Sequence, residues 1–404
     1  MIDSPEPLTC CFIITSMPVG GAETLLVNLM RRMDPRWVRP EIICLKEPGP
    51  LGDEIASEFP LHANLIGGKY DVAVVPRLAR LLRTRGADAV VTVGAGDKMF
   101  WGRAAARLAG VPVIASALHS TGWPDGVGRL NRLLTPITDA FIGVADSHGE
   151  FLREFEKFPA PKVNVIRNGV DCDRFHADHD ARQSVIDELG LPSEAKIIGI
   201  VAALRPEKNH EMLVEAVAKL QDRHPLLHAL IVGDGPERAD IETHCRRLDV
   251  VDRVHLLGNR SDTPRLLAAM DVFTLCSLNE ASPVSILEAL ACETPVVSTN
   301  VGSIRETVIP GQTGTLVDSE DVDGFANAIT DLLGNSQTRE SMGRQGRTLV
   351  VETGSLTSMV QGYQDLIHEI HSRKRTQGKS VAVLARAKTS GHSRAAASGM
   401  ITSP

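Results

Sequence analysis

The sequence predicts an α/β protein made of two doubly wound parallel sheets that face each other across a cleft. Three observations lead to this fold class. Short apolar segments alternate with amphipathic helical segments, which is typical of parallel strands joined by helical crossovers. The alternation occurs both before and after a polar, irregular segment at 164–181, a plausible hinge. The length of 404 residues also favours two domains over one.

The first half contains the first of these two series. In the helix expected at Ala22–Met33, apolar side chains recur at helical spacing, whereas the apolar runs around it are as short as strands. A second helix, at Val74–Arg85, has a basic face. The expected strands are Leu8–Thr15, Pro40–Leu45, Ala89–Val93, Val111–Ser116 and Ala140–Ala145.

The second half repeats the pattern. A helix is expected at Met212–Arg223. We place the boundary between an N-terminal domain, 1–170, and a C-terminal domain, 171–355, inside the irregular segment. The expected strands are Lys196–Val201, Leu227–Val232, Val254–Leu256, Val272–Leu275, Thr294–Ser298 and Gly314–Val317.

Composition and charge narrow the function. Hydrophobic residues make up 43% of the chain, enough for ordinary globular cores, and the net charge is -7. A mildly acidic balance argues against a general nucleic-acid binder. Residues 371–404 contain no acidic side chain and carry +7, which leaves -14 on the remainder. This Ser-, Ala- and Gly-rich segment is predicted to be a disordered basic tail.

The cysteines and the apolar runs indicate where the protein works. Seven cysteines are scattered without metal-ligand spacing, which fits a reducing compartment. We find no secretory signal pattern at the start of the chain. No run reaches the roughly 18–20 apolar residues that a membrane span requires. We therefore expect a cytoplasmic protein.

Ligands of open α/β sheets bind beyond the carboxyl ends of the strands, so residues just after strands are the first candidates. Gly20 and Gly21 follow the first strand and open the first helix, where free N–H groups favour an anion. A plain strand-to-helix turn, with Glu23 as an acid of the first helical turn, would explain the same residues. The full dinucleotide fingerprint is missing, which disfavours a nicotinamide enzyme.

Two cations follow the strand at 196–201. Arg205 and Lys208 are three residues apart, a spacing at which they would straddle a diphosphate. The alternative is a solvated charged turn in which Glu207 is the partner.

Two carboxylates, Glu280 and Glu288, bracket the start of another helix. Pro283 suits a first helical position, so Ser282 is expected to cap a helix that runs through Ala291. Glu288 lies among apolar residues of that helix, where a carboxylate is costly unless it is hydrogen-bonded. The functional interpretation is an acceptor for ligand hydroxyls, and the alternative is an acid on an exposed face.

The remaining polar candidates are weaker. His119 follows the strand at 111–116, where it would serve as a hydrogen-bond donor or an acid, or be an ordinary loop histidine. Asp171 and Asp173, like Asp321 and Asp323, form Asp-x-Asp pairs in polar, turn-like segments. Because neither pair is clearly placed in the cleft, we predict no metal site.

Taken in order, these motifs resemble the retaining nucleotide-sugar glycosyltransferases of the GT-B fold, glycosyltransferase family 4 (glycosyl transferases group 1). The resemblance extends from about Cys10 to Ile370 and is strongest from Val254 to Val317. The motifs are Gly20-Gly21-Ala22-Glu23, Asn168-Gly169-Val170-Asp171, Arg205…Lys208, Gly233-Asp234-Gly235-Pro236 and Glu280…Glu288.

The resemblance implies a role for each matching position. Arg205 and Lys208 would clamp the donor diphosphate, and Glu288 would accept from the ribose hydroxyls. Glu280 and His119 would lie near the transferred sugar. Further donor-binding positions, several of them through backbone N–H groups, would be Gly20, Gly21, Gly233, Gly235, Ser282, Pro283, Val284 and Ser285. A last helix at about 356–370 would pack back on the N-terminal domain.

The resemblance also implies partners. The donor would be a UDP- or GDP-sugar and the acceptor a glycan or a lipid-linked molecule, in the assembly of surface polysaccharide or glycolipid. No cofactor and no metal are expected. The arginines of the helix at 74–85 and the basic tail would favour peripheral contact with the inner face of an anionic membrane.

Two departures concern the sugar, and three other functions stay open. The sequence has Ala281-Ser282-Pro283 where the family often has an aromatic residue and a glycine, and Gly302-Ser303-Ile304-Arg305-Glu306 where it often has Gly-Gly-x-Pro-Glu. Both segments are expected near the donor sugar. An epimerase or a phosphorylase of the same architecture, or a non-catalytic nucleotide-sugar binding module, would share these motifs.

Overall fold

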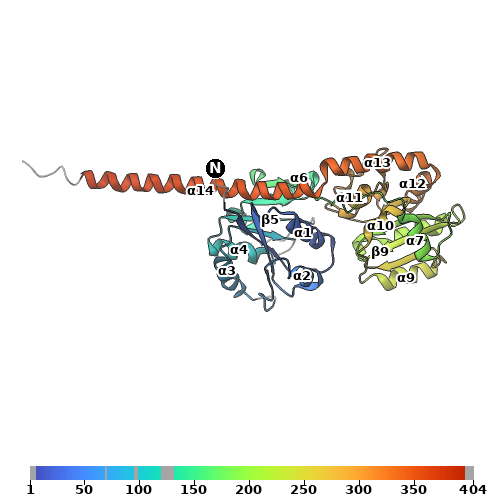
Figure 1. The fold of residues 1–404 in the computed structure, drawn as a ribbon, viewed down its shortest axis with the longest axis horizontal. Helices are drawn as coiled ribbons and strands as arrows, with labels where there is room; N and C mark the ends of the chain where they lie inside the picture. Colours follow the sequence, from blue (N-terminus) through green and yellow to red (C-terminus); the bar gives the residue numbers. More distant parts are fainter. Residues whose placement is uncertain (1–5, 69–70, 95–98, 120–131, 396–404) are drawn as a thin grey trace, which may run out of the picture.

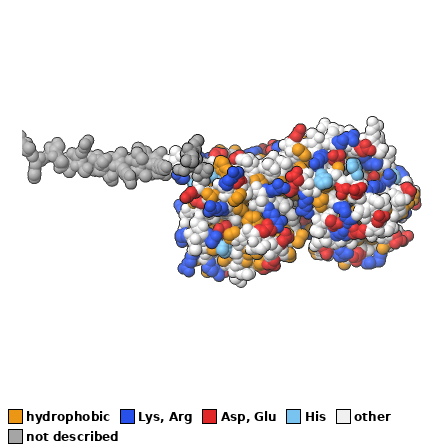
Figure 2. Space-filling model, in the orientation of Figure 1, with side chains coloured by type: hydrophobic (Ala, Val, Ile, Leu, Met, Phe, Trp, Pro, Cys, Tyr) orange, Lys and Arg blue, Asp and Glu red, His pale blue; other side chains and the backbone are white. Residues whose placement is uncertain are grey.

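The computed structural model describes residues 6–68, 71–94, 99–119 and 132–395. It consists of two α/β lobes side by side, with one long helix that crosses the N-terminal lobe and extends beyond it (Figure 1). The lobes meet at a waist in the space-filling view (Figure 2). The strands of each lobe form one parallel sheet covered by helices. The predicted fold class, two facing doubly wound domains, is thereby confirmed.

The N-terminal lobe has a seven-stranded sheet with the order β3-β2-β1-β4-β5-β6-β7. Its strands are β1 (Leu8–Ile14), β2 (Val38–Cys44), β3 (Leu61–His62), β4 (Ala89–Val93), β5 (Val113–Ala117), β6 (Ala140–Gly143) and β7 (Val163–Val165). Its helices are α1 (Gly21–Arg32), α2 (Gly49–Ile55), α3 (Val74–Arg85), α4 (Met99–Ala109) and α6 (Asp146–Glu154), with short 3-10 turns η1 (Thr135–Ile137) and η2 (Ala160–Lys162).

The C-terminal lobe has a six-stranded sheet with the order β10-β9-β8-β11-β12-β13. Its strands are β8 (Lys196–Val201), β9 (Leu227–Val232), β10 (Val254–Gly258), β11 (Val272–Leu275), β12 (Val296–Thr299) and β13 (Gly314–Val317). Its helices are α7 (Ala181–Leu189), α8 (His210–Leu220), α9 (Arg238–Arg247), α10 (Thr263–Ala269), α11 (Val284–Ala291), α12 (Val322–Gly334) and α13 (Ser336–Thr353), with 3-10 turns η3 (Pro206–Lys208) and η4 (Ile304–Glu306).

The strand sequences explain why helices cover both faces of each sheet. All five residues of β4 are buried, and β8 is buried over four consecutive positions. Continuous apolar runs of this kind are typical of parallel strands, which are buried on both faces. The strand order reverses between β1 and β4 in one lobe and between β8 and β11 in the other. These switch points are where a doubly wound sheet binds its ligand.

The last helix, α14 (Leu356–Ala395), belongs structurally to the N-terminal lobe. Its buried residues Met359, Tyr363 and Ile367 pack in one cluster with side chains of β1 and α1. The helix continues to Ala395, whereas the sequence analysis predicted a disordered tail from residue 371. The segment 371–395 has no proline and many Ala, Lys and Arg residues, which extend a helix that is already formed. Residues 396–404 of the predicted tail lie outside the described residues.

Two chain segments cross between the lobes and pair with each other. Val170 and Ser355 form an isolated parallel bridge. The Val170 N–H donates to the Gly354 carbonyl, and the Leu356 N–H donates to the Val170 carbonyl, both at 2.9 Å. A Cβ at Gly169 would lie 2.4 Å from the Ser355 carbonyl oxygen, so only glycine allows this approach. Two hydrogen-bonded chain segments therefore connect the lobes.

Candidate active site

The loop after β11 brings two of the predicted residues together. Glu280 in this loop is 8% exposed. Its Oε1 accepts hydrogen bonds from Lys208 Nζ at 2.5 Å and from Ser277 Oγ at 2.7 Å. Lys208 follows β8, so this ion pair joins the two strand ends at the switch point of the C-terminal sheet.

The backbone of the same loop is held from three sides. Gly302 has φ +55°, and a Cβ there would lie 1.7 Å from the Glu280 carbonyl oxygen. The Ser303 hydroxyl donates to the Ala281 carbonyl. Asn168, in the segment that joins the lobes, donates from Nδ2 to the Ser282 carbonyl at 2.9 Å. These supporting contacts were not predicted, because they join residues far apart in the sequence.

Arg205 takes no part in the Lys208–Glu280 ion pair. Its side chain is 57% exposed, and its Nη1 lies 4.0 Å from Oε1 of Glu207. Glu23 of α1 is close enough for the Arg205 charge to act on it: burial raises the pKa of Glu23, and Arg205 opposes the rise. The structure therefore separates the predicted cation pair: Lys208 pairs with Glu280, and Arg205 acts on Glu23 of α1.

The N-terminus of α1, which carries Glu23, lies within electrostatic range of Arg205. Gly20 is the N-cap of this helix and has no side chain with which to cap it. The carboxylate of Glu23 folds back onto its own backbone N–H, and a Cβ at Gly20 would lie 2.5 Å from Glu23 Oε2. A Cβ at Gly21 would meet nothing within 4 Å. A helix N-terminus and a guanidinium thus lie near each other, and both attract anions.

Helix α11 carries Glu288 beside the same loop. The helix begins at Val284, with Pro283 at the N-cap in an extended conformation. The prediction that Ser282 caps this helix is therefore wrong: the chain is still extended at Pro283, and the Ser282 carbonyl is bound by Asn168. The first-turn N–H groups of such a helix, here those of Val284 and Ser285, have no intrahelical acceptor.

Glu288 is a partly buried carboxylate, and no hydrogen bond from the described residues acts on its pKa. Burial raises its pKa to about 7, and the charge of Arg174 opposes this rise. A hydrogen-bonding ligand would satisfy the group and stabilise its ionised form. Its placement therefore favours the interpretation as an acceptor for hydroxyl groups.

Gly233 and Gly235 support the loop that carries Arg205. Gly233 has φ +137°, and a Cβ there would lie 2.0 Å from the Ala202 carbonyl oxygen. A Cβ at Gly235 would lie 2.4 Å from the Leu204 carbonyl oxygen. The loop after β9 therefore packs directly on the loop after β8, and the packing alone requires both glycines.

His119 lies after β5 beside a small cavity. Burial lowers the pKa of His119 to about 4, and His148 adds to the effect. The cavity is lined mainly by apolar residues, among them Phe12, Met359 and Tyr363. Because the imidazole is neutral at neutral pH, its chemistry is that of a hydrogen-bond donor or acceptor rather than of a charged acid.

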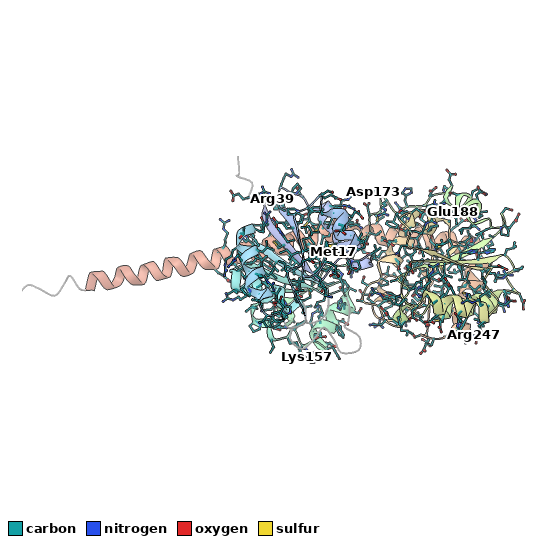
Figure 3. The ribbon with its side chains drawn as sticks, turned by 90° about the horizontal axis from the view of Figure 1, so that it is seen from below. Met17, Arg39, Lys157, Asp173, Glu188 and Arg247 are labelled. Atoms are coloured by element: carbon teal, nitrogen blue, oxygen red, sulfur yellow. The ribbon has the colours of Figure 1, made fainter. Side chains whose placement is uncertain are left out.

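The Asp-x-Asp pairs have structural partners. Asp171 accepts from Arg32 at 2.7 Å, and Figure 3 shows its neighbour Asp173 at the junction of the lobes. Asp321 caps α12 through Gly324 N, and Asp323 accepts from Lys219 at 2.7 Å. Within the described ranges, no three His, Cys, Asp or Glu side chains are grouped as metal ligands would be.

Comparison with protein families assigns the chain. The family Glycosyltransferase Family 4 matches residues 19–174, and the family Glycosyl transferases group 1 matches residues 181–349. Together the two matches take in most of both lobes. The chain belongs to the GT-B glycosyltransferases of the family 4 type. The resemblance stated from the sequence motifs is confirmed.

Individual relatives and solved structures agree with this assignment. The glycosyltransferase is 29% identical over 310 residues to EpsF of Bacillus subtilis (strain 168), which covers 74% of this chain and 80% of EpsF. It is 28% identical to the Escherichia coli UDP-Gal:alpha-D-GlcNAc-diphosphoundecaprenol alpha-1,3-galactosyltransferase, with 80% and 87% coverage. The structure of Anabaena Alr3699/HepE in complex with UDP-glucose superposes with a TM-score of 0.78 at 20% identity, covering 91% of this chain and 100% of that one.

Proposed function

We propose that this glycosyltransferase moves a sugar, with retention of anomeric configuration, from a UDP- or GDP-sugar to a glycan or a lipid-linked acceptor in surface polysaccharide or glycolipid synthesis. The observation that carries the proposal is the pair formed by Lys208 and the buried Glu280 at the switch point, beside the partly buried Glu288. Two relatives support the substrate classes: one is a UDP-Gal:alpha-D-GlcNAc-diphosphoundecaprenol galactosyltransferase, and the other is a GDP-mannose-dependent phosphatidylinositol monomannoside mannosyltransferase.

In the proposed reaction the bond between the anomeric carbon and the phosphate oxygen breaks, and its electron pair goes to the phosphate. The acceptor oxygen bonds to the anomeric carbon on the same face and loses its proton to the departing phosphate. Negative charge grows on that phosphate while the sugar becomes oxocarbenium-like. Arg205, Lys208 and the first N–H groups of α11 would stabilise this charge. Glu280 Oε1 accepts two hydrogen bonds, which favours a positioning role over nucleophilic attack.

We further propose that no metal ion takes part. The donor diphosphate brings about two negative charges, which are costly to desolvate unless they are matched. Arg205 offers one positive charge and Lys208 a second, which it shares with Glu280. The carboxylates of the Asp-x-Asp pairs that bind Arg32, Gly324 and Lys219 already have partners. Activity should therefore persist after treatment with EDTA. Activity that is lost to EDTA and restored by Mg²⁺ or Mn²⁺ would refute this part of the proposal.

The proposed contact with a membrane rests on the basic tail. Helix α3 does not offer Leu78 and Leu82 to a membrane, because both are buried in the N-terminal core. Two of its four arginines form ion pairs, Arg77 with Asp71 and Arg85 with Glu41. Along the described residues, no helix combines the length and the apolar character of a membrane span.

We therefore assign the proposed peripheral contact to the basic segment 371–404, at the cytoplasmic face. All seven cysteines are free thiols, which fits a reducing compartment. Co-sedimentation with anionic and neutral vesicles at low and high salt tests this contact. Binding should need anionic lipid and weaken with salt, and a chain shortened after residue 377 should lose it.

A donor screen tests the central proposal. The protein is incubated with UDP- and GDP-sugars, and the donor is identified by the rise in melting temperature that a ligand of the folded state causes. The product made with a panel of acceptors is then analysed for anomeric configuration. Transfer with inversion would refute retention, and donor turnover without acceptor or with free phosphate would favour an epimerase or a phosphorylase.

A further inference from the structure

A carboxylate of the C-terminal lobe caps a helix of the N-terminal lobe. Helix α6 begins after Ala145, which cannot cap it with a side chain. Glu306 of η4 accepts three hydrogen bonds there: from the backbone N–H of Asp146 at 2.9 Å, from the backbone N–H of Ser147 at 2.7 Å and from Ser147 Oγ at 2.5 Å. A helix N-terminus has unpaired N–H groups and favours negative charge. Glu306 therefore supplies, from the other lobe, the cap that α6 lacks.

The bonds at α6 favour the charged form of Glu306. Burial acts to raise the pKa of this carboxyl, but the hydrogen bonds from Ser147 and from the backbone outweigh it, so the pKa lies below its ordinary value. Hydrogen bonds to a charged group are among the stronger polar contacts. The contact is also compact, because one side chain satisfies two backbone donors and one hydroxyl.

Glu306 is connected to the Glu280 loop by a short, well-packed segment. Ile304, between them, is fully buried. Gly302 approaches the Glu280 carbonyl so closely that no side chain would fit, and Ser303 bonds the Ala281 carbonyl. A displacement of Glu306 would therefore be transmitted to the loop that carries Glu280.

A second contact between the lobes holds the other end of this loop, where Asn168 binds the Ser282 carbonyl. The β11 loop is thus fixed to the N-terminal lobe directly through Asn168 and indirectly through Glu306. The sequence analysis expected the segment that contains Glu306 near the donor sugar. The structure instead turns its carboxylate to α6.

We propose that Glu306 is a positioning residue, a latch that holds the two lobes closed and thereby sets the Glu280 loop for sugar transfer. Glu306 does not touch the reacting atoms in this role. The inference rests on the proposed transferase function for its catalytic consequence, but not for its effect on closure of the lobes.

The test compares full-length wild-type protein with Glu306→Ala, Ser147→Ala and the double variant. Glu352→Ala is the matched control, because Glu352 is an exposed glutamate of the same lobe. Small-angle X-ray scattering reports closure with and without UDP, and steady-state kinetics report kcat and KM for the donor. Loss of charged hydrogen bonds should shift the equilibrium toward the open form by about 10- to 100-fold. We expect a larger radius of gyration and a lower kcat, with a smaller change in KM.

The outcomes separate the latch from the proposed function. If no donor is turned over by any variant, the transferase proposal fails, while scattering still measures the latch. A folded Glu306→Ala protein with the scattering and kcat of wild type would overturn the latch. A control variant Glu352→Ala that changes the radius of gyration and kcat as much as Glu306→Ala does would also overturn it. Ser147→Ala keeps the test possible if Glu306→Ala does not fold. Its effect must be smaller than that of Glu306→Ala and must not add to it, because both remove the same contact.

Discussion

Replacing Glu288 with Gln should make the free protein more stable at high pH and weaken its donor site. The pKa of Glu288 is raised from 4.5 to about 7 by burial. A carboxyl group whose folded-state pKa is raised stabilises the fold below its unfolded pKa and loses that contribution as pH rises through the folded value. At 1.36 kcal/mol per pKa unit, ionised Glu288 costs the folded state about 3 kcal/mol above pH 7. Glutamine has the same shape and carries no charge.

Urea unfolding of wild type and Glu288→Gln at pH 5 and pH 8 measures this difference. The variant should gain up to about 3 kcal/mol relative to wild type between the two pH values. The neighbouring thiol of Cys292 does not titrate between these pH values, because burial raises its pKa to about 12. Calorimetric titration at pH 8 should show donor binding weaker by about 1.5–3 kcal/mol. A stability difference that does not change with pH would refute the reasoning, and unchanged donor affinity would refute the role in binding.

Two further predictions concern the cleft. Arg205→Ala and Lys208→Ala should each lower turnover by about 10²–10³. Only Lys208→Ala should also destabilise the fold, by about 2 kcal/mol, because it leaves the buried Glu280 with a single hydrogen-bond partner. Equal melting temperatures of the two variants would contradict this. Gly302→Ala should disrupt the Glu280 loop and abolish turnover. Gly311 also has a positive φ but has free space around it, so Gly311→Ala should lower the free energy of unfolding by only about 1 kcal/mol. The urea midpoints and initial rates of both variants test this.

The fold was predictable because its signal is local. Strands such as β4 and β8 are apolar runs of the right length, and the alternation with helices implies parallel sheets. The prediction of disorder was wrong for residues 371–395, for a local reason as well. The composition of this segment resembles that of disordered segments, but the segment follows directly on a helix that is anchored by Tyr363 and Ile367. Composition alone does not show that a helix has already been nucleated.

The site was predictable only in part. Positions just after strands made Arg205, Lys208 and Glu280 candidates, because the carboxyl ends of parallel strands meet at one edge of the sheet. The partner of each residue was not predictable: Lys208 binds Glu280, whereas Arg205 acts on Glu23 of the other lobe. These pairings depend on rotamers and on the placement of the lobes, neither of which leaves a periodic signal.

The double crossing at Val170 and Ser355 has a consequence for exchanging parts between related enzymes. The N-terminal lobe is discontinuous in sequence, since its sheet is covered by α14 from the far end of the chain. A chimera joined only near residue 170 would combine the foreign sheet with a helix shaped for another surface. An exchange of the N-terminal lobe should therefore carry 1–170 and 356–370 together, with 171–355 inserted between them.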